Sequence, residues 1–322
     1  MNVTLDGIDL GQPVMGRALS PDELNGKVVL VHFWGADASP SLPDLPHLTT
    51  LSESYAPFGL VVVGVHVRPM AQEQMKTKAK LYGISYPVTA EGRIKDGNDF
   101  KYIPHCILFG ASGKCIYRGA TKDIDARILA ALGSALTDHI GGKPTKALTQ
   151  WTDGLRKGQP PATLVQKAVT LSKSPEADTA AQAKTLVGHL TELAEREIKD
   201  IEALRADDPI TVLPRLTRLS TDFKGLPPGA GASHLLAEWK KDKAVSAELK
   251  ARPLIENIRE LDAALQAALA DGDPKSPDFQ RSQAGTLNRL KNTIQQLKRT
   301  AADAPSTKAA LEIAGRYGIS VK

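Results

Sequence analysis

The chain has 322 residues, which is enough for two domains with separate hydrophobic cores. No run of about 18 apolar residues occurs, and this excludes a membrane-spanning helix. Two cysteines are too few for a disulfide scaffold or a cysteine-rich metal site. Residues 1–140 carry a net charge of −1 and residues 141–322 a net charge of +6, so the basic character belongs to the second half.

The first six residues lack a basic stretch followed by an apolar core, so no signal peptide is expected at this end of the sequence. Removal of such a peptide from a longer precursor stays open.

Strand and helix patterns alternate through the first 140 residues. Two apolar, β-branched runs predict buried strands, two segments have helical composition, a Gly-containing turn joins two further strands, and a last helix follows. In chain order these elements are the strand 28–34, the helix 43–55, the strand 60–66, the helix 72–82, the hairpin 106–109 with 115–117, and the helix 123–136. Such alternation predicts a central sheet that is covered on both faces.

From about residue 143 the strand patterns vanish, and Ala, Leu, Lys and Glu dominate. The loop 141–144 is the expected domain boundary. Breaks between helices are predicted at four Gly- or Pro-containing stretches, at 158–161, 207–209, 225–229 and 271–274.

Two segments of the second half carry an apolar seam with 4-3 spacing. The seams consist of Leu254, Ile258, Leu261, Leu265 and Ala268, and of Leu287, Leu290, Ile294 and Leu297. Each seam must be buried against a partner, and both are too short for a long coiled coil. Antiparallel packing of helices is therefore expected.

Three separated motifs in the first half resemble the thioredoxin-like superfamily, in its redoxin branch of extracytoplasmic thiol–disulfide oxidoreductases and peroxiredoxin relatives. The motifs are Asn-Gly-Lys followed by the strand 28–34, the stretch 82–88, and the stretch 102–109 with Ser-Gly-Lys at 112–114. The resemblance implies an α/β thioredoxin-like sandwich in residues 1–140. Residues 141–322 are expected to form an all-α helical domain, which is similar to the tails that follow some bacterial redoxin domains.

Redox chemistry in this family needs two cysteines two residues apart at a helix N-terminus, where the first thiol becomes a nucleophilic thiolate. The resemblance places these cysteines at Ala38 and Ser41, in the stretch Ala-Ser-Pro-Ser. Neither side chain can form a disulfide, so the CxxC motif is lost and no catalytic residue is expected here. Ser41 has no assignable His/Asp partner, and a helix-capping role is expected for its hydroxyl group.

Two neighbouring positions also depart from the family pattern. Asp37 replaces the usual Trp before the first cysteine, and its negative charge would raise the pKa of a neighbouring thiol. His32 stands where thioredoxins carry a buried carboxylate in the first core strand.

Pro104 falls on the cis-proline of the family, whose loop presents backbone groups to an extended substrate segment. A peptide-binding groove is therefore predicted to remain beside the emptied site. Its candidate residues are Trp34, Asp37, Ala38, Ser41, Ile103, Pro104 and His105.

Cys106 and Cys115 are the only thiols, and they allow two interpretations. A hairpin register centred on Ala111 and Ser112 would set them diagonally on one face, near the outer limit for a disulfide. The favoured interpretation is two small core residues, because free cysteine is among the most buried residue types.

The remaining patterns exclude other classes of site. The seven histidines form no metal-ligand spacing with Cys, Asp or Glu, and no Gly-rich phosphate loop is present, so no metal or cofactor is expected. The basic residues of the second half are interleaved with acidic ones and predict solvated helix faces without nucleic-acid binding.

Three hypotheses for the function follow. The first is a redox-inactive thioredoxin-like module that binds or scaffolds an unknown protein or peptide. The second is a divergent thiol–disulfide oxidoreductase that uses Cys106 and Cys115. The third is a structural protein that associates with itself through the helical domain. An extracytoplasmic location is favoured over a cytoplasmic one.

Overall fold

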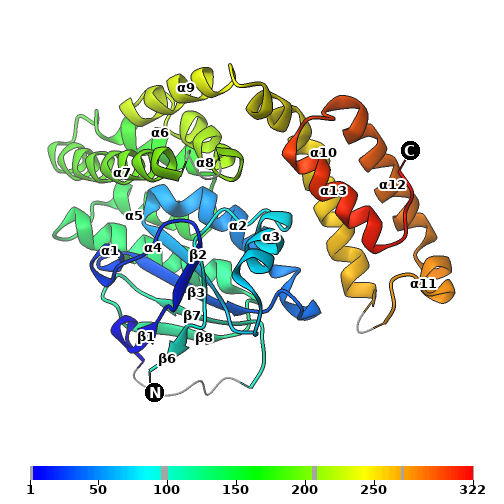
Figure 1. Cartoon of the computed structure of the whole chain (residues 1–322). Coiled ribbons are helices and arrows are strands. Elements are labelled where there is room, and N and C mark those ends of the chain that lie inside the picture. Colours follow the sequence, from blue (N-terminus) through cyan, green and yellow to red (C-terminus); the bar gives the residue numbers. More distant parts are fainter. Residues whose placement is uncertain (1–2, 96–100, 205–208, 270–271, 322) are drawn as a thin grey trace.

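A six-stranded mixed sheet organises the N-terminal part of the computed structural model, which describes residues 3–95, 101–204, 209–269 and 272–321 (Figure 1). The strand order is β2-β5-β4-β3-β7-β8, with parallel pairing of β3 to β4 and of β4 to β5 and antiparallel pairing elsewhere. The bounds are β2 (Gln12–Met15), β3 (Val28–Trp34), β4 (Leu60–His66), β5 (Val88–Ala90), β7 (His105–Phe109) and β8 (Cys115–Gly119). A separate antiparallel ladder joins β1 (Ile8–Asp9) to β6 (Arg93–Ile94).

The predicted order of strands and helices is confirmed, and the structure adds four short strands. The sequence did not reveal β1, β2, β5 and β6 because each has only two to four residues. β2 even contains Pro13, which is tolerated because this strand lies at the edge of the sheet.

All seven residues of β3 are buried, because both faces of the sheet are covered. One face packs against α2 (Asp44–Tyr55), α3 (Gln72–Leu81) and α4 (Ile124–Ile140). The other face is covered by the N-terminal segment and by Leu24 of the short helix α1 (Pro21–Leu24). Side chains that alternate along β3 therefore enter two different cores.

Helices make up the described residues beyond position 141, which confirms the all-α prediction for this half. Their bounds are α5 (Lys146–Arg156), α6 (Pro161–Leu171), α7 (Ala177–Leu204), α8 (Pro209–Asp222), α9 (Pro227–Trp239), α10 (Lys243–Leu269), α11 (Pro277–Ser282), α12 (Ala284–Thr300) and α13 (Pro305–Arg316). The four predicted breaks fall at the junctions after α5, α7, α8 and α10, whereas the breaks after α6, α9, α11 and α12 were not predicted. Residues 207–208 and 271 of the predicted breaks lie outside the described residues.

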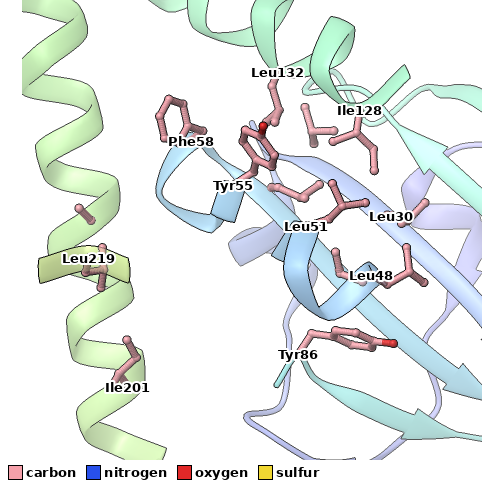
Figure 2. Close-up of a cluster of buried hydrophobic side chains, with 14 of the residues drawn as sticks. Leu30, Leu48, Leu51, Tyr55, Phe58, Tyr86, Ile128, Leu132, Ile201 and Leu219 are labelled. Carbon is pink, nitrogen blue, oxygen red and sulfur yellow. The ribbon is translucent and has the colours of Figure 1, made fainter. Parts of the chain in front are cut away.

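One continuous hydrophobic core joins the sheet to the first helices of the second half. Figure 2 shows Leu30 of β3, Leu51 of α2 and Leu132 of α4 in this cluster, together with Ile201 of α7 and Leu219 of α8. The apolar surface of α2 and α4 is thus buried by helices that follow the loop 141–144. The domain boundary at this loop remains a prediction.

A second core cluster lies in the C-terminal bundle formed by α10, α12 and α13, which extends to one side of the sheet (Figure 1). Figure 1 shows α12 running back along α10, and the predicted seams pack against each other in this cluster. Ala268 is the exception because it is exposed. The seams that suggested self-association are therefore buried within a single chain.

Polar side chains of α10 and of the end of α13 form a hydrogen-bonded network inside the C-terminal bundle, and this network lies beside Tyr82 at the end of α3. Tyr317 donates its hydroxyl hydrogen to Oδ1 of the buried Asp262, at 2.6 Å, and Nη1 of Arg316 donates to both oxygens of the same carboxylate. Next to this network, the Arg259 guanidinium lies against Gly83 at the end of α3. No helix among the described residues is long and apolar enough to cross a bilayer.

The contact at Gly83 predicts the effect of a single added methyl group. A Cβ at Gly83 would lie 2.1 Å from Nη1 of the buried Arg259, and the residue has a φ of +68°. Gly318 is a matched control, because its φ is also +68° and it follows α13 with the same backbone hydrogen-bond pattern. The atom nearest to the point that a Cβ would occupy there is Cγ of Lys275 at 3.7 Å, which is an ordinary contact. Gly318→Ala should cost about 1–2 kcal/mol from backbone strain alone. Gly83→Ala should cost at least about 1 kcal/mol more, from overpacking.

Urea unfolding of the two variants and the unmodified protein measures this difference. Equal losses of stability in the two variants would show that Arg259 does not pack tightly on α3.

Candidate functional site

The loop that follows β3 is held by backbone hydrogen bonds and by His66. The Ala36 N–H donates to Nε2 of His66 at 2.9 Å, and the His66 ring meets the Trp34 ring edge-on at 5.0 Å between centroids. Further along, the Ala38 N–H donates to the Gly35 carbonyl and the Ser41 N–H to the Ala38 carbonyl. These contacts fix the positions that correspond to the two family cysteines.

Ser41 is fully buried in the short 3₁₀ helix η2 (Ser39–Ser41), and its Oγ accepts a hydrogen bond from the Gly35 N–H at 3.4 Å. The expected helix-capping role is wrong, because α2 begins three residues later, at Asp44, after Pro43. The hydroxyl group stabilises the loop from inside. It is neither exposed as a nucleophile nor free to contact a ligand.

Three loops meet beside Gly35. A Cβ on this glycine would lie 2.8 Å from Cγ of Arg68, 3.0 Å from Cδ1 of Ile103 and 3.2 Å from Oδ1 of Asp37. The Ile103–Pro104 peptide bond is cis, as the resemblance predicted. The loops after β3 and β4 and the cis-proline loop therefore form one surface, and close approach of the three loops requires glycine at its centre.

The predicted groove residues divide into two layers. Asp37 is exposed, and Ala38, Ile103 and Pro104 are partly exposed, so these four can contact a ligand. The others, Trp34, Ser41 and His105, are buried and support the surface from below. The expectation that His105 faces the groove is wrong, because it lies within the sheet, where Nε of Arg118 donates to its Nε2 at 3.3 Å.

Two exposed residues of this surface were missed by the sequence analysis. Tyr102, 59% exposed, stands directly before the cis-proline loop with its ring edge-on to His105. Arg68 extends from the loop after β4. An aromatic residue next to the cis-proline was the one available signal. Arg68 carried none, because only the fold brings the β4 loop to Gly35.

Helix α10 of the C-terminal bundle contacts η2 on the other side of the loop. The helical half thus packs beside the loop that carries Ala38 and Ser41 without burying Asp37, Ile103 or Tyr102. The surface defined by Asp37, Ala38, Arg68, Tyr102, Ile103 and Pro104 stays accessible, and we call it the three-loop surface.

His32 lies beneath the loop and is fully buried. Burial, followed by the nearby His105, lowers the pKa of His32 to about 3, so its ring is neutral near pH 7. Its Nε2 lies 3.8 Å from Oδ2 of Asp44, whose pKa is raised by burial and whose carboxylate accepts a hydrogen bond from Thr121. The residue at the family's carboxylate position therefore supplies no charge to this site at neutral pH.

Cys106 and Cys115 are both free thiols and lie on opposite faces of the sheet. The β7–β8 register pairs Cys106 with Gly119 and Cys115 with Phe109, and it shifts between Leu108 and Phe109. The predicted diagonal arrangement is wrong, because such an irregularity turns the following side chains to the other face. Burial raises the pKa of the Cys106 thiol to about 12 and also raises the pKa of Cys115.

The part of the chain that the structure describes holds no cluster of three or more His, Cys, Asp or Glu side chains that could bind a metal ion.

The sheet order, the helix α2 after β3 and the cis-proline loop define a class of protein: the N-terminal part has a thioredoxin-like fold of the redoxin thiol–disulfide oxidoreductase type. The comparisons with known proteins agree with this class. The chain is 33% identical over 97 residues to protein DipZ of Mycobacterium tuberculosis and 24% identical over 103 residues to the thiol-disulfide oxidoreductase ResA of Bacillus subtilis. No protein-family model matches the chain.

These matches cover only part of each protein. They span 28% of this chain and 14% of DipZ, and 31% of this chain and 57% of ResA. Among solved structures, a thiol:disulfide interchange protein from Chlorobium tepidum is 25% identical, with a TM-score of 0.33 over 38% of this chain and 91% of that chain. The chain thus spans less than two thirds of the length of the curated relatives that it matches.

The buried, neutral His32 predicts a pH dependence of stability. The unfolded chain binds a proton at this residue below about pH 6.5, whereas the folded protein binds it only near pH 3. Stability from the neutral ring is therefore complete above pH 6.5 and is lost as the pH falls toward 3. Between pH 7.5 and pH 5 the loss from this residue should be about 2 kcal/mol.

Urea unfolding of the unmodified protein and of His32→Leu at both pH values isolates this contribution, because other titrating groups are common to the two proteins. The unmodified protein should lose about 2 kcal/mol more than the variant. Identical losses would contradict a neutral buried His32.

Proposed function

We propose that this chain is a redox-inactive member of the thioredoxin-like class that binds a partner polypeptide through the three-loop surface. One observation carries the proposal: the loop that holds the redox cysteines in this class carries Ala38 and Ser41, and the two thiols of the chain, one buried and one partly buried, lie elsewhere on opposite sheet faces. A thiol–disulfide exchange needs an accessible thiolate.

The chemistry of the three-loop surface supports a polypeptide ligand. Tyr102 and Ile103 offer apolar contact area, and Asp37 and Arg68 offer one charge of each sign. Pro104 keeps the cis geometry of the family loop, whose backbone groups face an extended substrate segment in related proteins. An extended peptide with an apolar side chain fits these features better than a small polar ligand does.

An alternative in which Cys106 and Cys115 act as a redox pair gains nothing from the structure. The two side chains enter different cores, and the raised pKa of each thiol disfavours the thiolate at neutral pH.

An extracytoplasmic location is proposed from the likeness to redoxin-type oxidoreductases, and cell fractionation tests it.

Insulin reduction tests the redox half of this proposal. The unmodified protein and Cys106→Ala/Cys115→Ala should both show no turnover above background. Ala38→Cys/Ser41→Cys should gain turnover, because the Ser41 N–H to Ala38 carbonyl bond of 2.8 Å closes a turn. Such turns hold the outer Cα atoms within about 7 Å, which a disulfide can span.

The control is Ala38→Cys alone, which lacks a resolving thiol. Turnover by the unmodified protein that disappears in the double alanine variant would refute redox inactivity.

Peptide binding tests the other half. Peptides selected from a random display library on the unmodified protein should bind Ile103→Asp at least tenfold more weakly in fluorescence anisotropy, because the charge disrupts apolar contact at the three-loop surface. Ile116→Asp is the matched control, since Ile116 is 49% exposed on β8 and touches Gly110 at the far end of β7. Equal weakening in both variants, or no selectable peptide, would count against this surface.

A further inference from the structure

A partly enclosed cavity of about 70 Å³ lies between the start of β3 and helix α7, away from the three-loop surface. Its floor includes apolar side chains of β4 and α7, among them Leu60 and Leu193. Six charged side chains also line it, namely Arg17, Lys27, Arg196, Glu197, Asp200 and Arg215. Four of these are cations and two are carboxylates.

The two carboxylates already have cationic partners. Nε of Arg215 lies 2.6 Å from Oε1 of Glu197, and Nε of Arg17 lies 3.2 Å from Oδ2 of Asp200. Arg17 also pairs with Glu23, which stands outside the lining. Within the described part of the chain, no carboxylate lies within 4.0 Å of a charged nitrogen of Lys27 or Arg196. Lys27 and Arg196 thus make no direct ion pair in this cavity, and cations outnumber carboxylates in its lining by four to two.

Lys27 is held in place by the fold. Its N–H donates to the Leu24 carbonyl at 3.2 Å, and β3 begins at the next residue. The pKa of Lys27 is lowered, first by burial and then by the charges of Arg17 and Arg196, while Asp200 and Glu23 act in the opposite direction without cancelling the effect. On α7, Arg196 and Asp200 are four residues apart and share one helix face. An anion in the cavity would offset the repulsion between these cations.

We propose that this cavity binds a small dianion with oxygen acceptors, such as inorganic phosphate, between Lys27 and Arg196. A water molecule needs about 10–15 Å³ of such volume, so the cavity has room for roughly five water molecules. A phosphate ion, with one phosphorus and four oxygen atoms, is of about this size. The ammonium and guanidinium groups would donate charge-assisted hydrogen bonds to it. Because Lys27 precedes β3 and Arg196 belongs to α7, the bound anion would link the sheet to the helical half.

Isothermal titration calorimetry with inorganic phosphate at pH 7.5 and constant ionic strength tests the proposal on the full chain. The unmodified protein should show saturable one-to-one binding. Lys27→Gln and Arg196→Gln should each bind at least tenfold more weakly, and Arg196 is exposed, so its variant should retain the fold. Lys184→Gln, which changes an exposed lysine of α7 that does not line this cavity, is the matched control and should bind phosphate as the unmodified protein does.

A parallel titration with succinate separates phosphate from dicarboxylate chemistry. Binding of either anion with the same dependence on Lys27 and Arg196 supports the site. The proposal is overturned if neither anion binds saturably up to about 20-fold molar excess over about 1 mM protein, a limit near millimolar affinity. Equal affinities of Lys27→Gln and Lys184→Gln for phosphate would also overturn it.

Discussion

The helices that cover the sheet must bury their outer side against the second half of the chain, and the rest of the structure depends on this constraint. α2 and α4 have apolar residues on the side away from the sheet as well as on the side toward it, and α7 and α8 cover that outer side (Figure 2). Burial of apolar area is the dominant favourable term in folding. The helical half is therefore part of the core that supports the thioredoxin-like fold.

This shared core explains how the fold can persist around a site without redox cysteines. The loop after β3 is fixed by His66, by the buried hydroxyl group of Ser41 and by the close approach of three loops at Gly35. None of these contacts requires a thiol. The surface beside Pro104 leaves Asp37, Arg68 and Tyr102 exposed.

The division of the core also positions the charged groups. α10 begins in the first cluster, to which it contributes Val245, and continues in the second from Ala251 onward. This long helix sets Arg259 against Gly83 and brings the bundle beside η2. At the opposite side of the first cluster, α7 sets Arg196 near Lys27. Helices far apart in the sequence thus determine the surroundings of both candidate sites.

The sequence by itself determined the strands and helices with strong periodicity, the cis-proline at position 104 and the absence of cysteine at positions 38 and 41, because these depend on local pattern and residue identity. Only the tertiary structure decided that Ser41 and His105 are buried, that Arg68 joins the site and that Cys106 and Cys115 face opposite ways. The physical reason is that burial and strand register depend on packing between distant segments, and a shift of one residue reverses which face a side chain occupies.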